Sequence, residues 1–383
     1  MRGSIIKRGS TYSVVLDLGR GPDGKRLRRW HSGYATRRAA ERARVDLLAK
    51  LDSGGYVDPS RATVAEYLRS WLEHVGHQRA GATHERYEYV CERYLLPHLG
   101  ALRLQQLQPL HVQQTYDLLE ERGGKGGRPL QPGTVALCHR VLRRALKQAV
   151  RWQLVNRNVC EQVDPPTPGR GRPSGLEPEH TRVLLEAARG VGGWLAVFVT
   201  VGVVTGARRG ELLGLRWADV DLEHGTATIR RSLGVVRGQL VYSPPKTQAG
   251  ERTLQLPAFA HAALKAHRAQ QAQLRLAFGA AYDTASDLVI CREDGSPLRP
   301  DYVTHRFKRL VRDAGLPEQV HAHTMRHGFA SLLAAGGEGA ADIAKVLGHG
   351  DGGQLALRVY IRAQATAASR AAGVAERALG DPQ

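Results

Sequence analysis

Four short segments of the chain carry side chains suited to chemistry on a phosphate group. Residues 205–217 read TGARRGELLGLRW, and residues 323–337 read HTMRHGFASLLAAGG, so each presents arginine beside other polar groups. Fixed guanidiniums bind phosphate oxygens in pairs and offset the negative charge that develops there during attack. Residues 347–362, LGHGDGGQLALRVYIR, place a histidine eleven residues before a tyrosine. The fourth segment, PPKT, places Lys246 in a turn between two strand-like stretches.

Tyr360 has two interpretations when its segment is considered alone. Leu355, Leu357 and Val359 are apolar neighbours, so the tyrosine fits the end of a buried helical face with its hydroxyl at the rim. The same phenol suits attack on a phosphodiester, although a pKa of about 10 requires a proton acceptor or cationic surroundings at neutral pH. Features in the rest of the sequence are needed to choose between these interpretations.

Length and cysteine usage restrict the class of protein. A chain of 383 residues is long enough for two or three domains, each with its own core. Its four cysteines are far apart and form no C-x-x-C pair, which argues against a disulfide framework or a zinc cluster. The sequence has no apolar run of membrane-spanning length and no signal peptide, so we expect a cytoplasmic protein without a membrane partner.

Charge points to a polyanionic partner. The chain has 55 Lys and Arg against 36 Asp and Glu, a net charge of +19. Residues 1–50 alone hold 13 Lys and Arg against 4 Asp and Glu. A basic excess this large is typical of nucleic-acid binding, although ribosomal and membrane-surface proteins share it. About half of this basic excess lies in the first eighth of the chain, which indicates that it serves one binding function there.

The first fifty residues predict a small sheet backed by one helix. The stretch 11–18 alternates like a half-buried strand, 19–25 is rich in turn residues, and KRLRRWHS forms the next strand. Thr36 then caps a helix over 37–52. Arg26, Arg28 and Trp30 share one face of the strand, and Arg29 lies on the other. A basic sheet of this kind can enter a DNA groove, so we predict DNA contacts from Arg26, Arg28 and Arg29; the alternative is a solvated charged face.

A helical domain follows. Apolar periodicity predicts helices over 63–74, 83–96, 109–122 and 133–153. The last of these carries a basic face, which also includes His139 and Arg151, and its candidate DNA-binding residues are Arg140, Arg143, Arg144 and Lys147. The stretch 164–175, DPPTPGRGRPSG, has the composition of an exposed linker.

The remaining 200 residues predict a larger domain of mixed structure. Helices are expected over 177–189, 194–205, 258–278, 300–314, 323–335 and 340–348. Between the second and third of these lie three strand-like stretches, 226–233, 238–244 and 252–257, with Lys246 in the turn between the last two.

The order of these motifs resembles the tyrosine recombinases, in particular phage-type integrases with an added N-terminal arm-binding domain. The resemblance covers essentially the whole chain. It implies an arm-type DNA-binding domain at 1–60, a helical SAM-like core-binding domain at 61–160, a linker at 161–175 and a catalytic domain at 176–383. The expected fold class is mainly α with small β-sheets: a three-stranded sheet plus helix, the helical domain, and a mixed α+β catalytic domain.

The resemblance also implies a catalytic set. It assigns phosphate binding to the two arginines and to His349, a proton-accepting role to His323, proton donation to Lys246, and nucleophilic attack to Tyr360. The full set is Arg208, Lys246, His323, Arg326, His349 and Tyr360. Three alternatives stay open: a salt bridge from Arg208 to Glu211 at a helix start, a solvated Lys246, and a metal site that uses His321, His323 and His327 with His349 as a fourth ligand.

The implied function is site-specific DNA recombination through a covalent 3′-phosphotyrosyl intermediate, which integrates or excises a mobile element such as a prophage without metal or other cofactor. The implied partners are double-stranded DNA with core and arm-type sites, a homotetramer on that DNA, and accessory DNA-bending or excision factors; DNA-bound protein would lie on the nucleoid. The alternatives are a catalytically silent DNA-binding regulator and a type IB topoisomerase-like nicking enzyme. The GDGGQ stretch after His349 makes the interval between this histidine and Tyr360 longer than is usual in the family. A tyrosine displaced by this insert would favour the silent DNA-binding regulator.

Overall fold

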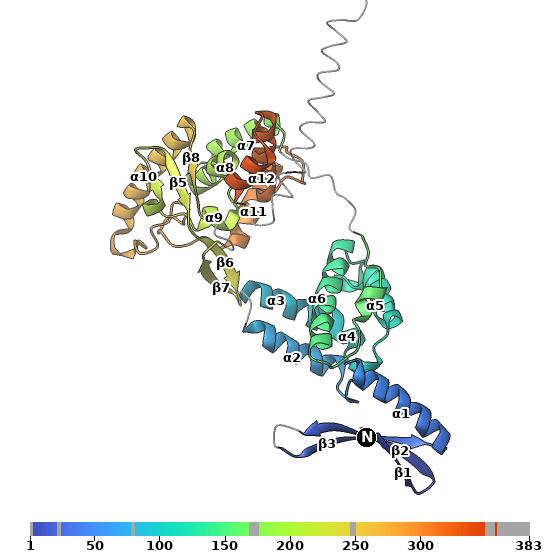
Figure 1. Cartoon of the computed structure of the whole chain (residues 1–383). Coiled ribbons are helices and arrows are strands. Elements are labelled where there is room, and N and C mark those ends of the chain that lie inside the picture. The colour runs from blue at the N-terminus through green and yellow to red at the C-terminus, as the bar shows by residue number, and fades with distance from the viewer. Residues whose placement is uncertain are drawn as a thin grey trace, which may run out of the picture. The chain divides into compact units, whose positions relative to one another are not determined.

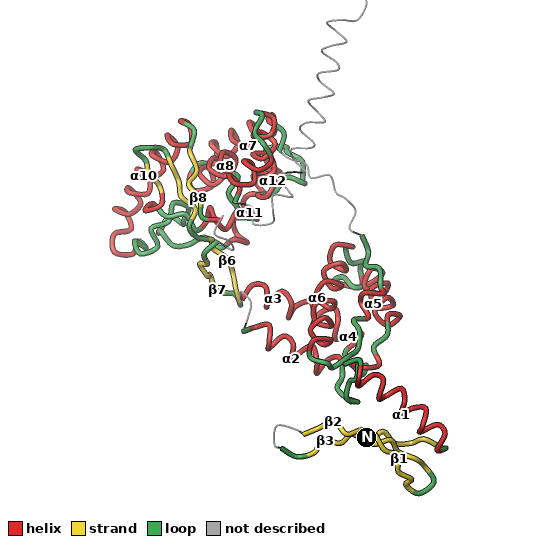
Figure 2. The backbone as a smooth tube through the Cα atoms, in the orientation of Figure 1, coloured by secondary structure: helices red, strands yellow, loops and turns green. Residues whose placement is uncertain are grey.

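The computed structural model describes residues 3–20, 24–77, 81–167, 176–245, 250–348 and residue 357. The chain divides into two compact units, Met1–Gly171 and Arg172–Gln383. Helices predominate in the described residues and the sheets are small and antiparallel, which confirms the predicted fold class (Figures 1 and 2). No helix among these residues combines the length and apolar composition needed to span a membrane.

A three-stranded antiparallel sheet packed on one helix begins the first unit. Its elements are β1 (Gly3–Arg8), β2 (Thr11–Arg20), β3 (Arg26–Tyr34) and α1 (Arg37–Asp52). The predicted helix is confirmed, with Thr36 accepting a hydrogen bond from the Ala39 amide at its start. Val14 and Leu16 are fully buried and pack with Ala40 of α1, so alternate residues of β2 face the helix. Strand β1 had no residue range in the prediction, because its GSIIKR sequence alternates weakly.

The helical part of the first unit has its own core. Its helices are α2 (Val64–Gly76), α3 (Gly81–Val90), α4 (Leu96–Leu99), α5 (Pro109–Arg122) and α6 (Pro132–Arg151), joined by the short turns η1 (Cys91–Leu95), η2 (Leu104–Gln106), η3 (Lys125–Gly127) and η4 (Val159–Gln162). The helix expected to end before Pro97 continues instead to Leu99 through η1, a π-helical turn. The wider turn accommodates a proline that lacks a backbone donor.

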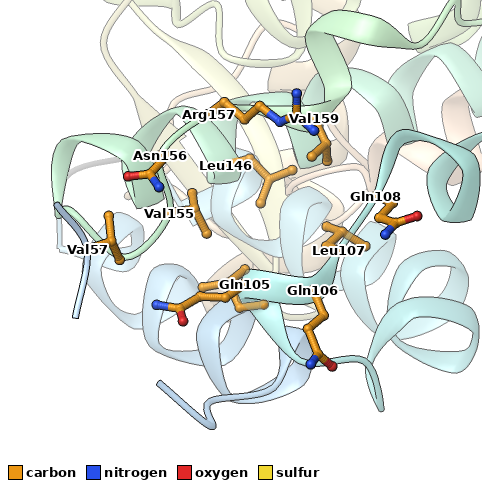
Figure 3. Close-up of a pocket in the computed structure, with 11 residues that line it drawn as sticks. Val57, Gln105, Gln106, Leu107, Gln108, Leu146, Val155, Asn156, Arg157 and Val159 are labelled. Carbon is orange, nitrogen blue, oxygen red and sulfur yellow. The ribbon is translucent and has the colours of Figure 1, made fainter. Parts of the chain in front are cut away.

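A glutamine joins the segment after α1 to the helical part. The Gln105 amide donates to the carbonyl of Asp58 at 2.8 Å and to that of Leu154 at 3.1 Å, and its oxygen accepts from the Ser60 amide at 3.0 Å. Beside it lies a pocket of about 400 Å³, shown in Figure 3. Its lining is neutral apart from Arg157. This glutamine therefore fixes the path of the chain between the sheet and the helices.

The second unit contains the larger core. Its helices are α7 (Pro178–Val191), α8 (Gly193–Thr205), α9 (Arg209–Leu213), α10 (Ala258–Phe278), α11 (Pro300–Asp313), α12 (Ala322–Ala335) and α13 (Ala340–Leu347), with short turns η5 (Trp217–Asp219) and η7 (Gly279–Ala281). Its strands are β4 (Val220–Asp221), β5 (Thr226–Ile229), β6 (Ser232–Val236), β7 (Gln239–Ser243) and β8 (Arg252–Gln255). Helix α8, apolar on all sides, runs through the core.

The predicted strand 226–233 is wrong, since it divides into β5 and β6, which belong to different sheets. The break falls at Arg230 and Arg231, and both side chains reach the buried carboxylate of Asp219, at 3.1 and 2.6 Å. Consecutive side chains in a strand point to opposite faces, so this shared partner cannot be reached from a regular strand.

The segment that carries Lys246 does not join paired strands. Strand β7 pairs with β6, whereas β8 pairs with β5, so the two strands on either side of the predicted turn do not form a hairpin with each other. Residues 246–249 themselves lie outside the described residues.

Candidate active site

The structure describes three of the six predicted catalytic residues. Arg208 immediately precedes α9, and His323 and Arg326 lie on the first turns of α12. Lys246, His349 and Tyr360 lie outside the described residues. The continuous described stretch 250–348 ends one residue before His349, and its end lies against both arginines: Arg326 donates to the Leu347 carbonyl at 2.6 Å and Arg208 to the Gly348 carbonyl at 3.4 Å.

A tight turn after α8 brings Arg208 to this position. Gly206 ends α8 in the left-handed conformation, and the hydroxyl of Thr205 accepts a hydrogen bond from the Ala207 amide. A Cβ atom at Gly206 would approach Leu347 and Phe329 to 2.7 and 2.8 Å, so the turn requires glycine both for its backbone angle and for space. The Gly206 carbonyl accepts from Arg326 at 2.8 Å, which ties this turn to α12.

The salt bridge at the start of α9 is present. The Arg208 guanidinium donates to Glu211 at 2.7 Å, and the Arg208 amide donates to the same carboxylate at 2.9 Å. The Arg208 side chain nevertheless stays 44% exposed. A guanidinium has more donors than these contacts use, so the ion pair orients Arg208 while leaving it able to bind a ligand. The structural and catalytic interpretations of Arg208 are therefore compatible.

Glu211 also binds a second arginine that was not among the sequence-predicted residues. Arg252 donates to the Glu211 carboxylate at 2.9 Å, and both side chains are buried. Burial by itself would raise the pKa of Glu211, but the hydrogen bonds and charge of Arg252, together with the hydrogen bonds from Arg208, outweigh it and lower the pKa. A signal for Arg252 existed in the sequence: in RTLQL it alternates with Leu254 and Leu256, which are inward-facing positions.

Three histidines cluster on α12. The ring centroids of His323 and His327 are 4.8 Å apart in an edge-to-face arrangement, and those of His321 and His323 are 6.4 Å apart. Although the His323 ring keeps contact with solvent, partial burial followed by the nearby His327 and Arg326 lowers its pKa to about 4. His323 is thus a neutral base at pH 7.

The other two histidines of this cluster differ in their hydrogen bonding. His321 caps α12 by accepting the Thr324 amide, while the buried Nδ1 of His327 has no partner among the described atoms. Within the described stretches, no three His, Cys, Asp or Glu side chains gather in a way that could hold a metal ion.

The predicted basic residues of α6 lie on the surface of the helix. Arg140, Arg143, Arg144 and Lys147 are exposed, and Arg144 also contacts the Tyr87 hydroxyl at 3.2 Å. His139 does not belong to this face: it is buried, with its Nδ1 3.3 Å from the Tyr116 hydroxyl.

The three predicted arginines of β3 are exposed but differ in their partners. Arg29 is held by Asp58 at 2.9 Å, and Arg26 contacts Asp17 at 3.4 Å. Arg28 lies directly opposite Asp17 in the register of β2 and β3, and both residues are on the face of the sheet that points away from α1. Trp30 on that same face is 43% exposed, and the guanidinium of Arg8 stacks over its ring. The surface therefore combines cations with an aromatic ring.

Comparison with known proteins identifies the family. Residues 175–366 match the phage integrase family, and residues 63–119 match the N-terminal SAM-like domain of phage integrases. A protein of Caldanaerobacter subterraneus subsp. tengcongensis, described as tyrosine recombinase XerC-like, is 27% identical over 366 residues, which cover 90% of this chain and 91% of that protein.

Two solved structures share the fold. The integrase of transposon Tn1549, in complex with circular intermediate DNA, has a TM-score of 0.65 at 20% identity and covers 81% of this chain and 99% of its own. The lambda integrase tetramer bound to a Holliday junction has a TM-score of 0.55 at 17% identity, with 91% and 96% coverage. The family match extends over half of the residues and confirms the resemblance seen in the motifs: the chain belongs to the phage integrase family and is a tyrosine recombinase that acts on DNA.

Proposed function

We propose that this chain recombines DNA at specific sites and that Tyr360 forms a covalent 3′-phosphotyrosyl link to the cleaved strand, so as to integrate or excise a mobile element. The observation that carries this proposal is the convergence of Arg208 and Arg326, from two distant segments, on the end of α13, with His323 close enough to both for their charges to add to burial in lowering its pKa. Cations from separate segments around one point suit a phosphodiester, whose charge has to be offset before a nucleophile can attack.

The proposed reaction starts with attack of the Tyr360 oxygen on phosphorus. Neutral His323 accepts the phenol proton, while Arg208 and Arg326, assisted by His349, bind the non-bridging oxygens. The bond from phosphorus to the 5′ oxygen breaks, and Lys246 supplies the proton that this oxygen takes up. The phosphotyrosyl ester conserves the energy of the broken bond, so a 5′ hydroxyl from another strand reverses the step without a nucleotide cofactor.

The two basic surfaces are proposed to bind different parts of the DNA. The exposed face of α6, with Arg140, Arg143, Arg144 and Lys147, suits the core site next to the cleaved bond. The β3 surface, with Arg26, Arg28 and Arg29, suits a separate arm-type site. In this proposal residues 1–60, 61–160 and 176–383 act as arm-binding, core-binding and catalytic domains, with 161–175 as linker.

The assembly is also a proposal. Exchange of strands between two sites involves four cleavages, so we propose a homotetramer on DNA; the lambda integrase tetramer on a Holliday junction supports this arrangement. Accessory DNA-bending or excision factors, and a cytoplasmic location on the nucleoid, belong to the same proposal.

A nicked suicide substrate tests the nucleophile. Release of a short fragment beyond the nick prevents religation, so cleavage accumulates as a protein–DNA adduct visible on a denaturing gel. Wild-type protein should form the adduct, also in excess EDTA, and Tyr360→Phe should bind DNA but form none. The matched controls are Tyr302→Phe and Tyr282→Phe, which should retain cleavage. An adduct with Tyr360→Phe would refute the assignment, and binding without an adduct in wild type would favour the silent regulator.

A further inference from the structure

The C-terminal end of α13 is bound by arginines from three different segments. Arg252 donates to the Val346 carbonyl at 2.9 Å, Arg326 to Leu347 at 2.6 Å and Arg208 to Gly348 at 3.4 Å. The last carbonyls of a helix lack intrahelical partners and form the negative end of its dipole, so cations are favourable there. Two of these arginines are proposed phosphate ligands, whereas Arg252 has no assigned role.

Arg252 connects several segments around the proposed site. It is the first residue of β8 and its side chain is only 7% exposed. Besides Val346, it donates to the Gly250 carbonyl at 3.1 Å and to the Glu211 carboxylate at 2.9 Å. Glu211 in turn holds Arg208. One buried guanidinium thus joins α9, the segment before β8 and the end of α13.

These three attachment points flank proposed catalytic groups. Lys246 precedes Arg252 by six residues, and His349 follows Val346 by three. We propose that Arg252 is a positioning residue, which holds α9 beside Arg208, the segment before β8 and the C-terminal end of α13 in one frame and thereby sets the rate of strand cleavage. This inference rests on the proposed function, because it concerns the geometry of the same site.

The expected effect follows from the sensitivity of catalysis to geometry. A shift of about 1 Å in a reacting group can lower a rate by about 100-fold. Without Arg252, the Glu211 carboxylate keeps Arg208 as its partner, but β8 and α13 lose their common anchor. DNA affinity depends mainly on many phosphate contacts spread over the surface, so it should change little. The predicted signature is a slower chemical step with unchanged binding.

The experiment compares Arg252→Met and Arg252→Lys with wild type, using full-length protein. The rate of adduct formation on the suicide substrate is measured at saturating DNA, and the Kd is measured separately. Arg252→Met should react about 100-fold more slowly with a Kd within about threefold of wild type. Arg252→Lys keeps the charge but not the fork of donors, so it should recover part of the rate.

A matched control is Arg230→Met. Arg230 also pairs with acidic groups next to this sheet, Asp219 in η5 and Glu251 just before β8, but none of its observed ion pairs reaches α9 or α13. Its adduct rate should stay within about threefold of wild type. Normal cleavage by Arg252→Met, an equal loss in Arg230→Met, or a loss confined to DNA affinity would each overturn the positioning role.

A second variant keeps the test decisive if Arg252→Met folds poorly. Arg252→Met combined with Glu211→Gln removes the buried carboxylate charge that has lost one of its two arginine partners, and should restore folding, as measured by thermal unfolding. The double variant should still react more slowly than Glu211→Gln alone, because the Val346 and Gly250 contacts remain lost. Equal rates in these two variants would reduce Arg252 to a structural partner of Glu211. Failure of the proposed function is distinct, since wild type would then form no Tyr360 adduct.

Discussion

Arg326→Lys is a sharp test of the site because Arg326 is almost completely buried, at 1% exposure, and still donates to two carbonyls, those of Gly206 and Leu347. Lysine keeps the charge but places it at one point, so it can serve one carbonyl well and not both. A hydrogen bond that involves a charged group contributes about 1.5–3 kcal/mol. We therefore expect the second unit to lose about that much unfolding free energy.

The same substitution should affect cleavage more strongly than stability. Loss of one fixed donor to a developing oxyanion typically costs about 3–4 kcal/mol of barrier, or roughly a 10²- to 10³-fold lower rate. Urea unfolding followed by far-UV circular dichroism gives the first quantity, and adduct formation at saturating DNA the second. Arg309→Lys, at an exposed ion pair with Asp313 on α11, is the control and should change neither. An Arg326→Lys rate within tenfold of wild type would refute the phosphate-binding role.

Three further outcomes are expected. Lys246→Ala should slow cleavage of ordinary DNA but regain its rate on a substrate with sulfur at the 5′ bridging position, whose leaving group needs no proton, whereas Arg208→Ala should not; absence of any rescue would argue against Lys246 as proton donor. The His323 ring should stay neutral at pH 5.5 by NMR in the free protein, and because its folded pKa of about 4 lies below the usual 6.5, its titration should destabilise the fold as the pH falls between these values; a ring that titrates near 6.5 would contradict this. Arg28→Ala should lower the salt dependence of arm-site binding by about one released counterion, and Arg29→Ala should lower it by less, because Arg29 is already paired with Asp58. Equal salt slopes in the two variants would show that the ion pair with Asp58 does not weaken the contact of Arg29 with DNA.

Local signals explain which elements were predictable from the sequence. Helices α5 and α10 have the predicted bounds, since α5 starts with a proline and Gly123 follows it, while α10 lies between Pro257 and Gly279. The pairing of β5 with β8 was not predictable, because nothing local indicates that a strand will join one more than twenty residues away. The strand break at Arg230 has the same origin: its cause, Asp219, lies outside the strand.

The site also has a part that the sequence predicts and a part that it does not. Motif order was enough to name Arg208, His323 and Arg326, and the family match supports the enzyme class. Among the described residues, Arg208, Arg252 and Arg326 make five hydrogen bonds to backbone carbonyls, and three of these join residues that are 94 to 140 positions apart in the sequence. Such contacts depend on the tertiary fold, which periodicity does not report. Arg252 was overlooked because a basic residue in a short strand usually faces solvent.

The different exposure of the two proposed phosphate ligands predicts an order of events on DNA. Arg208 is 44% exposed and needs no rearrangement to meet a phosphate, whereas Arg326 is 1% exposed and bonded to the Leu347 carbonyl. A phosphate that binds Arg326 has to draw it away from that carbonyl or share its donors. Arg208→Ala should therefore weaken the initial engagement of the scissile phosphate, and Arg326→Lys should slow the later step from bound complex to adduct. Stopped-flow association with a fluorescent core site, followed by quenched adduct formation, separates these steps. Equal effects of the two substitutions on association would show that both arginines meet the phosphate at once.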